Sequence, residues 1–208
     1  FMFFFNFYEI NDYIFGNYSS LIESSFIFQL RKLNFLLSNF LKNIDQVRIL
    51  DVSSIHNSLG SNNFFDPSLY VNYEMVFNID GNYEVSKKLI DLIRSKKAFF
   101  NKCIILDLDN IMWGGIVGDD GIDKIEIGDL GIGKAFKELQ QWVKKLKQRG
   151  IILCVCSKNN EEVAKEVFLN HPEMVLKLED ISIFIANWDS KVNNIKKIQE
   201  VLNIGFDS

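Results

Sequence analysis

Two carboxylates at the end of an apolar run have the clearest potential for chemistry in this sequence. Asp107 and Asp109 follow Lys102-Cys-Ile-Ile-Leu106, and the aromatic turn Trp113-Gly-Gly115 comes soon after. Such an apolar run is typical of a buried strand, in which residues i and i+2 point to the same side. We expect both carboxylates at the carboxyl end of that strand, where open α/β sheets bind ligands. Because they repel each other unless a cation or a shared proton relieves the charge, they favour a catalytic or metal site.

Polar residues also follow two later apolar runs. The first, Cys154-Val-Cys156, continues with Ser157, Lys158 and Asn159, and the second is followed by Asn187-Trp-Asp-Ser-Lys191. Since the carboxyl ends of parallel strands meet at one edge, a hydroxyl and an amine are expected near the carboxylates. Backbone N–H donors at a helix N-terminus, a hydroxyl and a fixed cation are groups that bind phosphate.

Composition favours a folded protein and argues against several classes. The 208 residues are 48% hydrophobic with a net charge of −4, which suggests neither a nucleic-acid partner nor a membrane surface. The three cysteines fall in predicted buried strands without a CxxC pair, and we interpret them as reduced thiols of a cytoplasmic protein. The aromatic residues 1–8 form a stretch too short and too interrupted for a signal peptide or a membrane span.

The chain divides near residues 98 to 101. Residues 1–100 read as an N-terminal α/β region, expected to be incomplete and without a cluster of catalytic groups. Its predicted elements are an amphipathic helix over 19–43, a strand over 46–52, a helix over 53–60 capped by Ser53 or Ser54, a loop over 62–68 and a helix over 84–97.

From residue 101 to 208 strands and helices alternate. Strands are predicted over 103–106, 151–156 and 181–186, and helices over 134–149, 161–170 and 190–202, the last two capped by Asn159 or Asn160 and by Asp189. Residues 114–128 resemble a β-hairpin flap turned at Asp119 and Asp120. This order predicts the α/β class, with a doubly wound parallel sheet.

Taken together, these motifs resemble the haloacid dehalogenase superfamily, and most closely its FkbH-like branch, subfamily IIIC. The resemblance rests on Asp107–Gly115, Cys156–Asn159, His171–Met174 and Asn187–Lys191, which follow one another at the family spacing. It is good from residue 102 to 208 and weaker from 47 to 101. It implies a Rossmann-like three-layer sandwich.

The resemblance assigns roles in phosphoryl transfer through an aspartyl phosphate. Asp107 would be the nucleophile and Asp109 the general acid and base. Ser157 would hydrogen-bond the phosphoryl group, and Lys191 would neutralise its charge. Mg²⁺ would be held by the Asp107 carboxylate and the Asp109 backbone carbonyl.

Further residues are expected beside the substrate, namely Lys158, Asn159, Trp113 and Gly114, with Trp188 packing at the site mouth. His171 reads as a loop hydrogen-bonder rather than a metal ligand.

Two departures from the family pattern matter. Ile111 replaces the usual Thr or Val of the first motif. The fourth motif, an acidic pair that completes the magnesium site, is expected a few residues beyond a segment like 203–208, so we interpret the sequence as a fragment of a longer protein.

Some FkbH-like proteins take a glyceryl unit from a phosphorylated three-carbon acyl donor, remove phosphate and load an acyl carrier protein through a cysteine thioester. The matching thiol is Cys156, although a small buried core residue is the simpler reading. Alternatives are a generic small-molecule phosphatase and a non-catalytic interaction module; a receiver-type domain ranks low because it lacks the second carboxylate.

Overall fold

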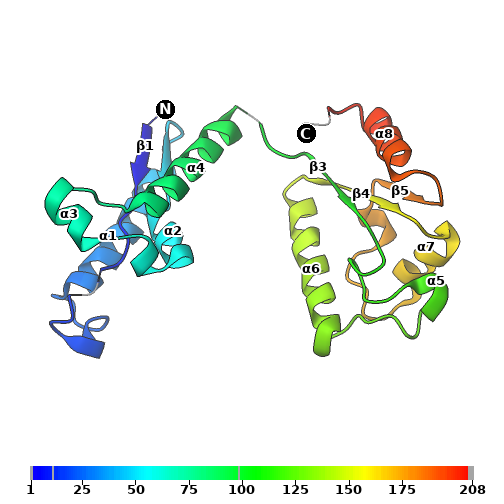
Figure 1. Ribbon diagram of the computed structural model, residues 1–208, viewed down its shortest axis with the longest axis horizontal. Helices are drawn as coiled ribbons and strands as arrows, with labels where there is room; N and C mark the ends of the chain where they lie inside the picture. The colour runs from blue at the N-terminus through cyan, green and yellow to red at the C-terminus, as the bar shows by residue number, and fades with distance from the viewer. Residues whose placement is uncertain (1, 11, 98, 206–208) are drawn as a thin grey trace. The chain divides into compact units, whose positions relative to one another are not determined.

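The chain forms two compact units, Phe1–Phe99 and Phe100–Ser208 (Figure 1). The computed structural model describes residues 2–10, 12–97 and 99–205. The predicted boundary, near residues 98 to 101, spans the division between the two units. No helix of the described residues combines the length and the apolar character needed to cross a bilayer.

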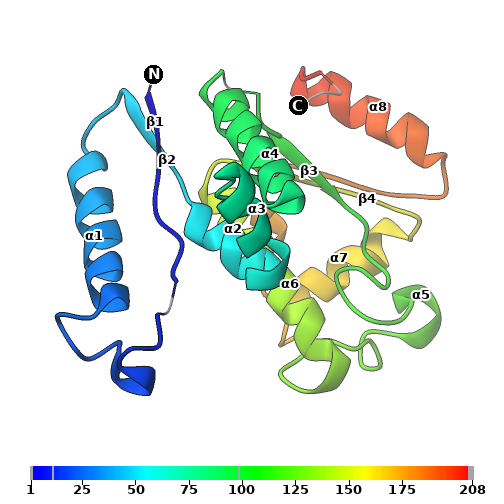
Figure 2. The same cartoon turned by 60° about the vertical axis from the view of Figure 1, so that its left-hand side comes forward.

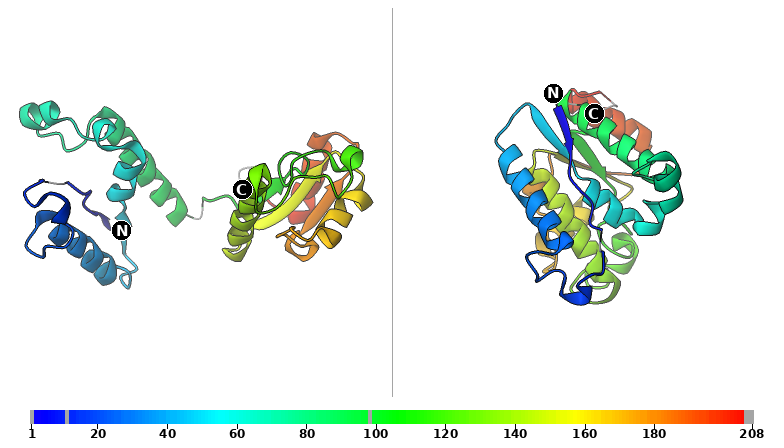
Figure 3. Two further views of the ribbon diagram at one scale, coloured as in Figure 1. Left: turned by 90° about the horizontal axis from the view of Figure 1, so that it is seen from below. Right: turned by 90° about the vertical axis from the view of Figure 1, so that its left-hand side faces the viewer.

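The first unit is built on a two-stranded parallel sheet, whose strands β1 (Met2–Phe5) and β2 (Val47–Leu50) are joined by a crossover containing the helix α1 (Phe26–Leu41). The helix lies alongside the strands (Figure 2 and Figure 3). After β2 come α2 (Val52–Leu59), α3 (Pro67–Tyr73) and α4 (Ile79–Lys96), with 3₁₀ turns at Gly16–Tyr18 and Ser61–Asn63. Buried side chains from β2, α2 and α4 pack around Phe64, which is fully buried.

Helix boundaries in this unit differ from the prediction because capping side chains decide them. α1 begins at Phe26, where Ser25 accepts a hydrogen bond from the Phe28 N–H, and not near residue 19. Asp51 caps α2, in place of Ser53 or Ser54. The predicted loop over 62–68 contains the start of α3, where Asp66 is the cap and a proline follows in the first turn, an arrangement typical of helix starts.

The second unit holds a parallel sheet in the order β3 (Cys103–Leu106), β4 (Ile152–Ser157), β5 (Ile183–Ala186). One face packs against α8 (Lys191–Leu202) through the cluster that contains Cys154, Cys156 and Ile198. The other face packs against α6 (Gly131–Gln148) and α7 (Glu161–Asn170), so helices cover both sides (Figure 1). This is the predicted α/β class with a parallel, Rossmann-like sheet.

Two local predictions in this unit are wrong. Residues 114–128 form no hairpin: Asp119 and Asp120 lie in the short helix α5 (Val117–Asp120), and Gly114 and Glu126 make an isolated antiparallel bridge. The α8 helix has Ser190, not Asp189, at its N-cap position, and no side chain caps it. Asp189 lies 3.7 Å from the Lys197 amine instead.

Candidate active site

Three side chains from separate elements meet at the carboxyl edge of the β3–β4–β5 sheet. Asp107 follows β3, Ser157 ends β4 and Lys191 begins α8. The Ser157 hydroxyl donates a hydrogen bond to Asp107 Oδ1 at 2.8 Å, and the Lys191 ammonium donates to Asp107 Oδ2 at 2.5 Å. The parallel topology brings these three residues together, as the spacing of the strand ends predicts.

The Asp107 carboxylate is both accessible and held ionised. Its side chain is 38% exposed, whereas Ser157 beneath it is 2% exposed. Burial raises the pKa of Asp107, but the hydrogen bonds from Lys191 and Ser157 outweigh it, and the pKa lies below its ordinary value. At neutral pH the group is therefore a carboxylate that a ligand can reach.

Asp109 is fixed by three donors. Its Oδ1 accepts from the Trp113 indole N–H at 2.9 Å and from the Val117 backbone N–H at 3.2 Å, and its Oδ2 accepts from Asn159 Nδ2 at 2.8 Å. Both oxygens are thus occupied by groups of the protein. Because each partner comes from a different segment, the carboxylate has one well-defined orientation.

The turn that joins the two aspartates to α5 is anchored by its apolar side chains. Leu108, Met112 and Trp113 are fully buried in the core of the unit. Asn110 adopts a left-handed conformation with φ of 59°, and its side chain accepts a hydrogen bond from the Gly115 N–H. Asparagine tolerates this conformation better than most residues, which makes the tight turn feasible.

A buried glutamine braces this turn from α6, and sequence reasoning missed it. Gln140, with no exposed surface, donates to the Met112 carbonyl at 2.7 Å and accepts from the backbone N–H groups of Val175 and Leu176 at 2.9 and 3.2 Å. The available signal was its position, because Gln140 lies four residues after Phe136 and three before the buried Val143.

The residues expected to touch substrate fall into two groups. Trp113 and Asn159 are buried and hold Asp109, so they are not placed as substrate contacts. The Gly114 backbone pairs with Glu126, and a Cβ at Gly114 would come within 2.9 Å of Phe136. Lys158 is exposed and remains available to a ligand, and Trp188 is 77% exposed rather than packed.

His171 accepts a hydrogen bond at its Nδ1 from the Glu173 backbone N–H, in keeping with the predicted loop role.

Cys156 is not placed as a nucleophile. Adjacent residues of a strand face opposite sides of a sheet, and Cys156 packs under α8 with 4% of its surface exposed. Burial raises the pKa of the Cys156 thiol, and this outweighs the effect of the nearby Lys191 ammonium. The neighbouring thiols Cys103 and Cys154 lie 3.7 Å apart, and burial raises the pKa of Cys154 to about 12.

The oxygen atoms at this edge suit a magnesium ion in kind. Carboxylate and carbonyl oxygens are the ligands Mg²⁺ uses, and Asp107 offers an accessible carboxylate. Among the residues that the structure describes, no group of three or more His, Cys, Asp or Glu side chains is arranged to hold a metal. Asp107 therefore supplies a suitable oxygen ligand for Mg²⁺, but only part of a complete ligand set.

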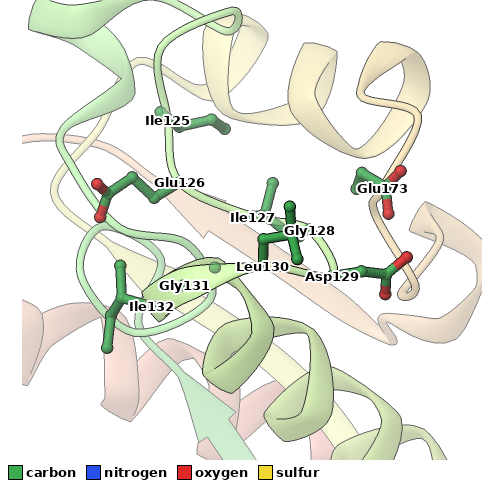
Figure 4. Close-up of a pocket in the computed structure, with 10 residues that line it drawn as sticks. Ile125, Glu126, Ile127, Gly128, Asp129, Leu130, Gly131, Ile132 and Glu173 are labelled. Carbon is green, nitrogen blue, oxygen red and sulfur yellow. The ribbon is translucent and has the colours of Figure 1, made fainter.

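A separate groove of about 560 Å³ lies beside the N-terminus of α6. It is lined by apolar and acidic residues, with Glu126 on one side and Asp129 and Glu173 on the other (Figure 4). The Lys137 ammonium forms ion pairs with Asp129 and Glu173, at 2.8 and 2.5 Å. Neither Asp107 nor Asp109 lines this groove.

The chain belongs to the α/β class, with a Rossmann-like parallel sheet. At the carboxyl edge of that sheet lie an ionised aspartate, a hydroxyl and a lysine. Residues 2–94 match the model of the FkbH N-terminal domain. A similar solved structure is the N-terminal part of the protein BF1531 from Bacteroides fragilis, described as containing a phosphatase domain complexed with Mg. It is 52% identical with a TM-score of 0.94, over 99% of this chain and 55% of that chain.

No curated protein matched the sequence. The chain spans 55% of the length of the solved relative. Residues 2–94 therefore resemble the FkbH N-terminal domain, and the chain as a whole resembles the N-terminal part of that relative.

Proposed function

We propose that this protein catalyses magnesium-dependent phosphoryl transfer from a small phosphorylated substrate, through a phosphorylated Asp107. A carboxylate oxygen of Asp107 attacks phosphorus, the bond from phosphorus to the leaving oxygen breaks, and Asp109 gives that oxygen a proton. Water then attacks the phosphorus, passing a proton to Asp109, and the bond to Asp107 breaks to release inorganic phosphate. This cycle returns both aspartates to their starting states.

The observation that carries the proposal is the state of Asp107. Its carboxylate is accessible, its pKa is lowered, and Ser157 and Lys191 already donate to its two oxygens. The same two donors lie within reach of a phosphoryl group attached to Asp107. Preorganised donors of this kind are each worth about 3–4 kcal/mol at a transition state.

A bound magnesium ion would be held by the Asp107 carboxylate, with the Asp109 backbone carbonyl as the further ligand that the family resemblance implies. When bound, it would supply positive charge to offset the negative charge of the phosphoryl group and of the two aspartates. The Mg in the crystal of the Bacteroides fragilis relative supports this cofactor.

The finer form of the proposal rests on the family resemblance. It assigns the chain to the haloacid dehalogenase superfamily, with a phosphorylated three-carbon acyl donor and loading of glyceryl onto an acyl carrier protein. In that form Cys156 would carry the glyceryl thioester. A covalent adduct that forms with an activated three-carbon acid in wild type and is lost in Cys156→Ala would support it, whereas an adduct that persists in the variant would refute that role.

A small-molecule phosphatase without carrier loading is the second candidate, and the burial of Cys156 favours it. A thiol that packs under α8 with a raised pKa is a poor nucleophile, while the Asp107 site needs no thiol.

The decisive experiment measures phosphate release by the full-length protein from a generic phosphate monoester such as p-nitrophenyl phosphate. We expect turnover with Mg²⁺, none after chelation, and a loss of at least about 1,000-fold in Asp107→Asn, because a carboxamide cannot form the acyl phosphate. Asp119→Asn, which neutralises an exposed carboxylate of α5, is the matched control and should keep full activity. Turnover retained by Asp107→Asn would refute the nucleophile.

A further inference from the structure

One buried amide links the two aspartates, one directly and the other through a hydroxyl. Asn159 is 3% exposed, and its Nδ2 lies 2.8 Å from Asp109 Oδ2 and 3.5 Å from Ser157 Oγ. The Ser157 hydroxyl in turn lies 2.8 Å from Asp107 Oδ1. The amide therefore touches one aspartate directly and reaches the other through a single hydroxyl.

The chemistry of these groups fixes the direction of each hydrogen bond. An amide NH₂ has two protons to donate, and the ionised carboxylate of Asp107 can only accept. If one amide proton points to Asp109 and the other to Ser157 Oγ, the Ser157 hydroxyl must direct its own single proton at Asp107. The reverse orientation of the amide would place its oxygen against Asp109 Oδ2 and would engage the proton that Asp109 gives to the leaving oxygen.

Asp109 needs such a partner on its second oxygen. Trp113 and Val117 both donate to Oδ1, which leaves Oδ2 to Asn159. Without the amide, Oδ2 of Asp109 would lose its donor. The carboxylate would then be held only through Oδ1 and would be free to rotate about its Cβ–Cγ bond.

We propose that Asn159 is a positioning residue, and not a substrate contact: it holds Asp109 in its working orientation and aims the Ser157 proton at Asp107. The proposal rests on the phosphoryl-transfer function proposed above and assigns this residue a role in that reaction. Because Asn159 acts through its two neighbours, its loss should slow turnover without weakening substrate binding.

The kinetic test compares Asn159→Ala and the isosteric Asn159→Asp with wild type and with Asn193→Ala, which removes an exposed amide from α8. We expect kcat of the alanine variant to fall about 10- to 100-fold, the range for one hydrogen bond to a charged group. The Asp variant should fall further, because it sets a carboxylate against Asp109. KM should stay within about threefold of wild type in both.

A spectroscopic signature separates this inference from the proposed function. The three tryptophans, Trp113, Trp142 and Trp188, each give one indole N–H signal in a ¹H–¹⁵N correlation spectrum. In Asn159→Ala we expect the Trp113 signal to move, because its acceptor Asp109 is released, while those of the exposed Trp142 and Trp188 stay in place and report an intact fold.

A moved Trp113 signal in a protein without phosphatase activity would support the contact and refute the function. A KM that rises as far as kcat falls would overturn the positioning role, and so would an Asn159→Asp variant with wild-type kcat and an unmoved Trp113 signal.

Discussion

Replacing Gln140 by leucine tests how the turn behind the aspartates is supported. The change keeps the approximate volume of the side chain but removes its amide. It leaves three backbone groups without their partner: the buried Met112 carbonyl and Leu176 N–H, and the partly buried Val175 N–H. Each unsatisfied buried group costs about 1–3 kcal/mol, and the added apolar contacts of leucine offset part of this.

We therefore expect Gln140→Leu to lose roughly 3–5 kcal/mol of unfolding free energy, a large share of the 5–15 kcal/mol typical of a whole domain. All three tryptophans lie in the second unit, at positions 113, 142 and 188, so tryptophan fluorescence during urea unfolding reports on this unit selectively. The midpoint should fall, while the slope with urea stays unchanged if the transition remains two-state.

The neighbouring residue provides the matched control. Gln141 is exposed on the same helix, so Gln141→Leu makes the same chemical change without removing a buried amide. We expect it to alter the unfolding free energy by less than about 0.5 kcal/mol. If Gln140→Leu is no less stable than Gln141→Leu, the bracing role of Gln140 is wrong.

Two further predictions concern stability in the same unit. Asp180 is 7% exposed, and burial raises its pKa, but the hydrogen bonds from Lys147 and the Lys177 N–H and the nearby Lys144 outweigh this and lower the pKa. The stabilisation by ionised Asp180 is present above the ordinary carboxyl pKa and is lost as pH falls through the lowered value. Because both lysines are 37% exposed, Asp180→Asn should cost only about 1–2 kcal/mol of unfolding free energy at pH 7 and almost nothing in strong acid. An equal cost at both pH values in urea titrations would contradict this. Gly114→Ala should lose about 1–3 kcal/mol, since its Cβ would lie 2.9 Å from Phe136 and from the Glu126 carboxylate, whereas Gly118→Ala meets nothing within 4 Å and should unfold like wild type in the same assay.

Periodicity and parallel topology account for what the sequence could predict. The bounds of β3 follow from an apolar run, and those of α7 from its capping residue and its helical spacing of apolar residues. Both sets of bounds match the prediction. The meeting of Asp107, Ser157 and Lys191 follows from the rule that parallel strands end at one edge. These features need only the order of the elements and not the detail of side-chain packing.

What escaped prediction depends on partners distant in sequence. Asn159 was expected beside the substrate, and its contact with Asp109, fifty positions away, exists only once β3 and β4 are paired. Trp113 likewise reads as a residue beside the substrate until the core that buries it is assembled. The missed helix α3 is a different case, since the Asp66-Pro67 start signal was present but was outweighed by the loop-like residues before it.

The alternation of side chains along β4 carries a consequence for evolution at this edge. Val155 and Ser157 face one side of the sheet, while Cys154 and Cys156 face the other. A shift of the strand by a single residue would exchange the two sets. Inserting one residue near the start of β4 would then carry Ser157 past Asp107 and bring Cys156 into its place, so one codon separates a hydroxyl donor from a thiol at this edge.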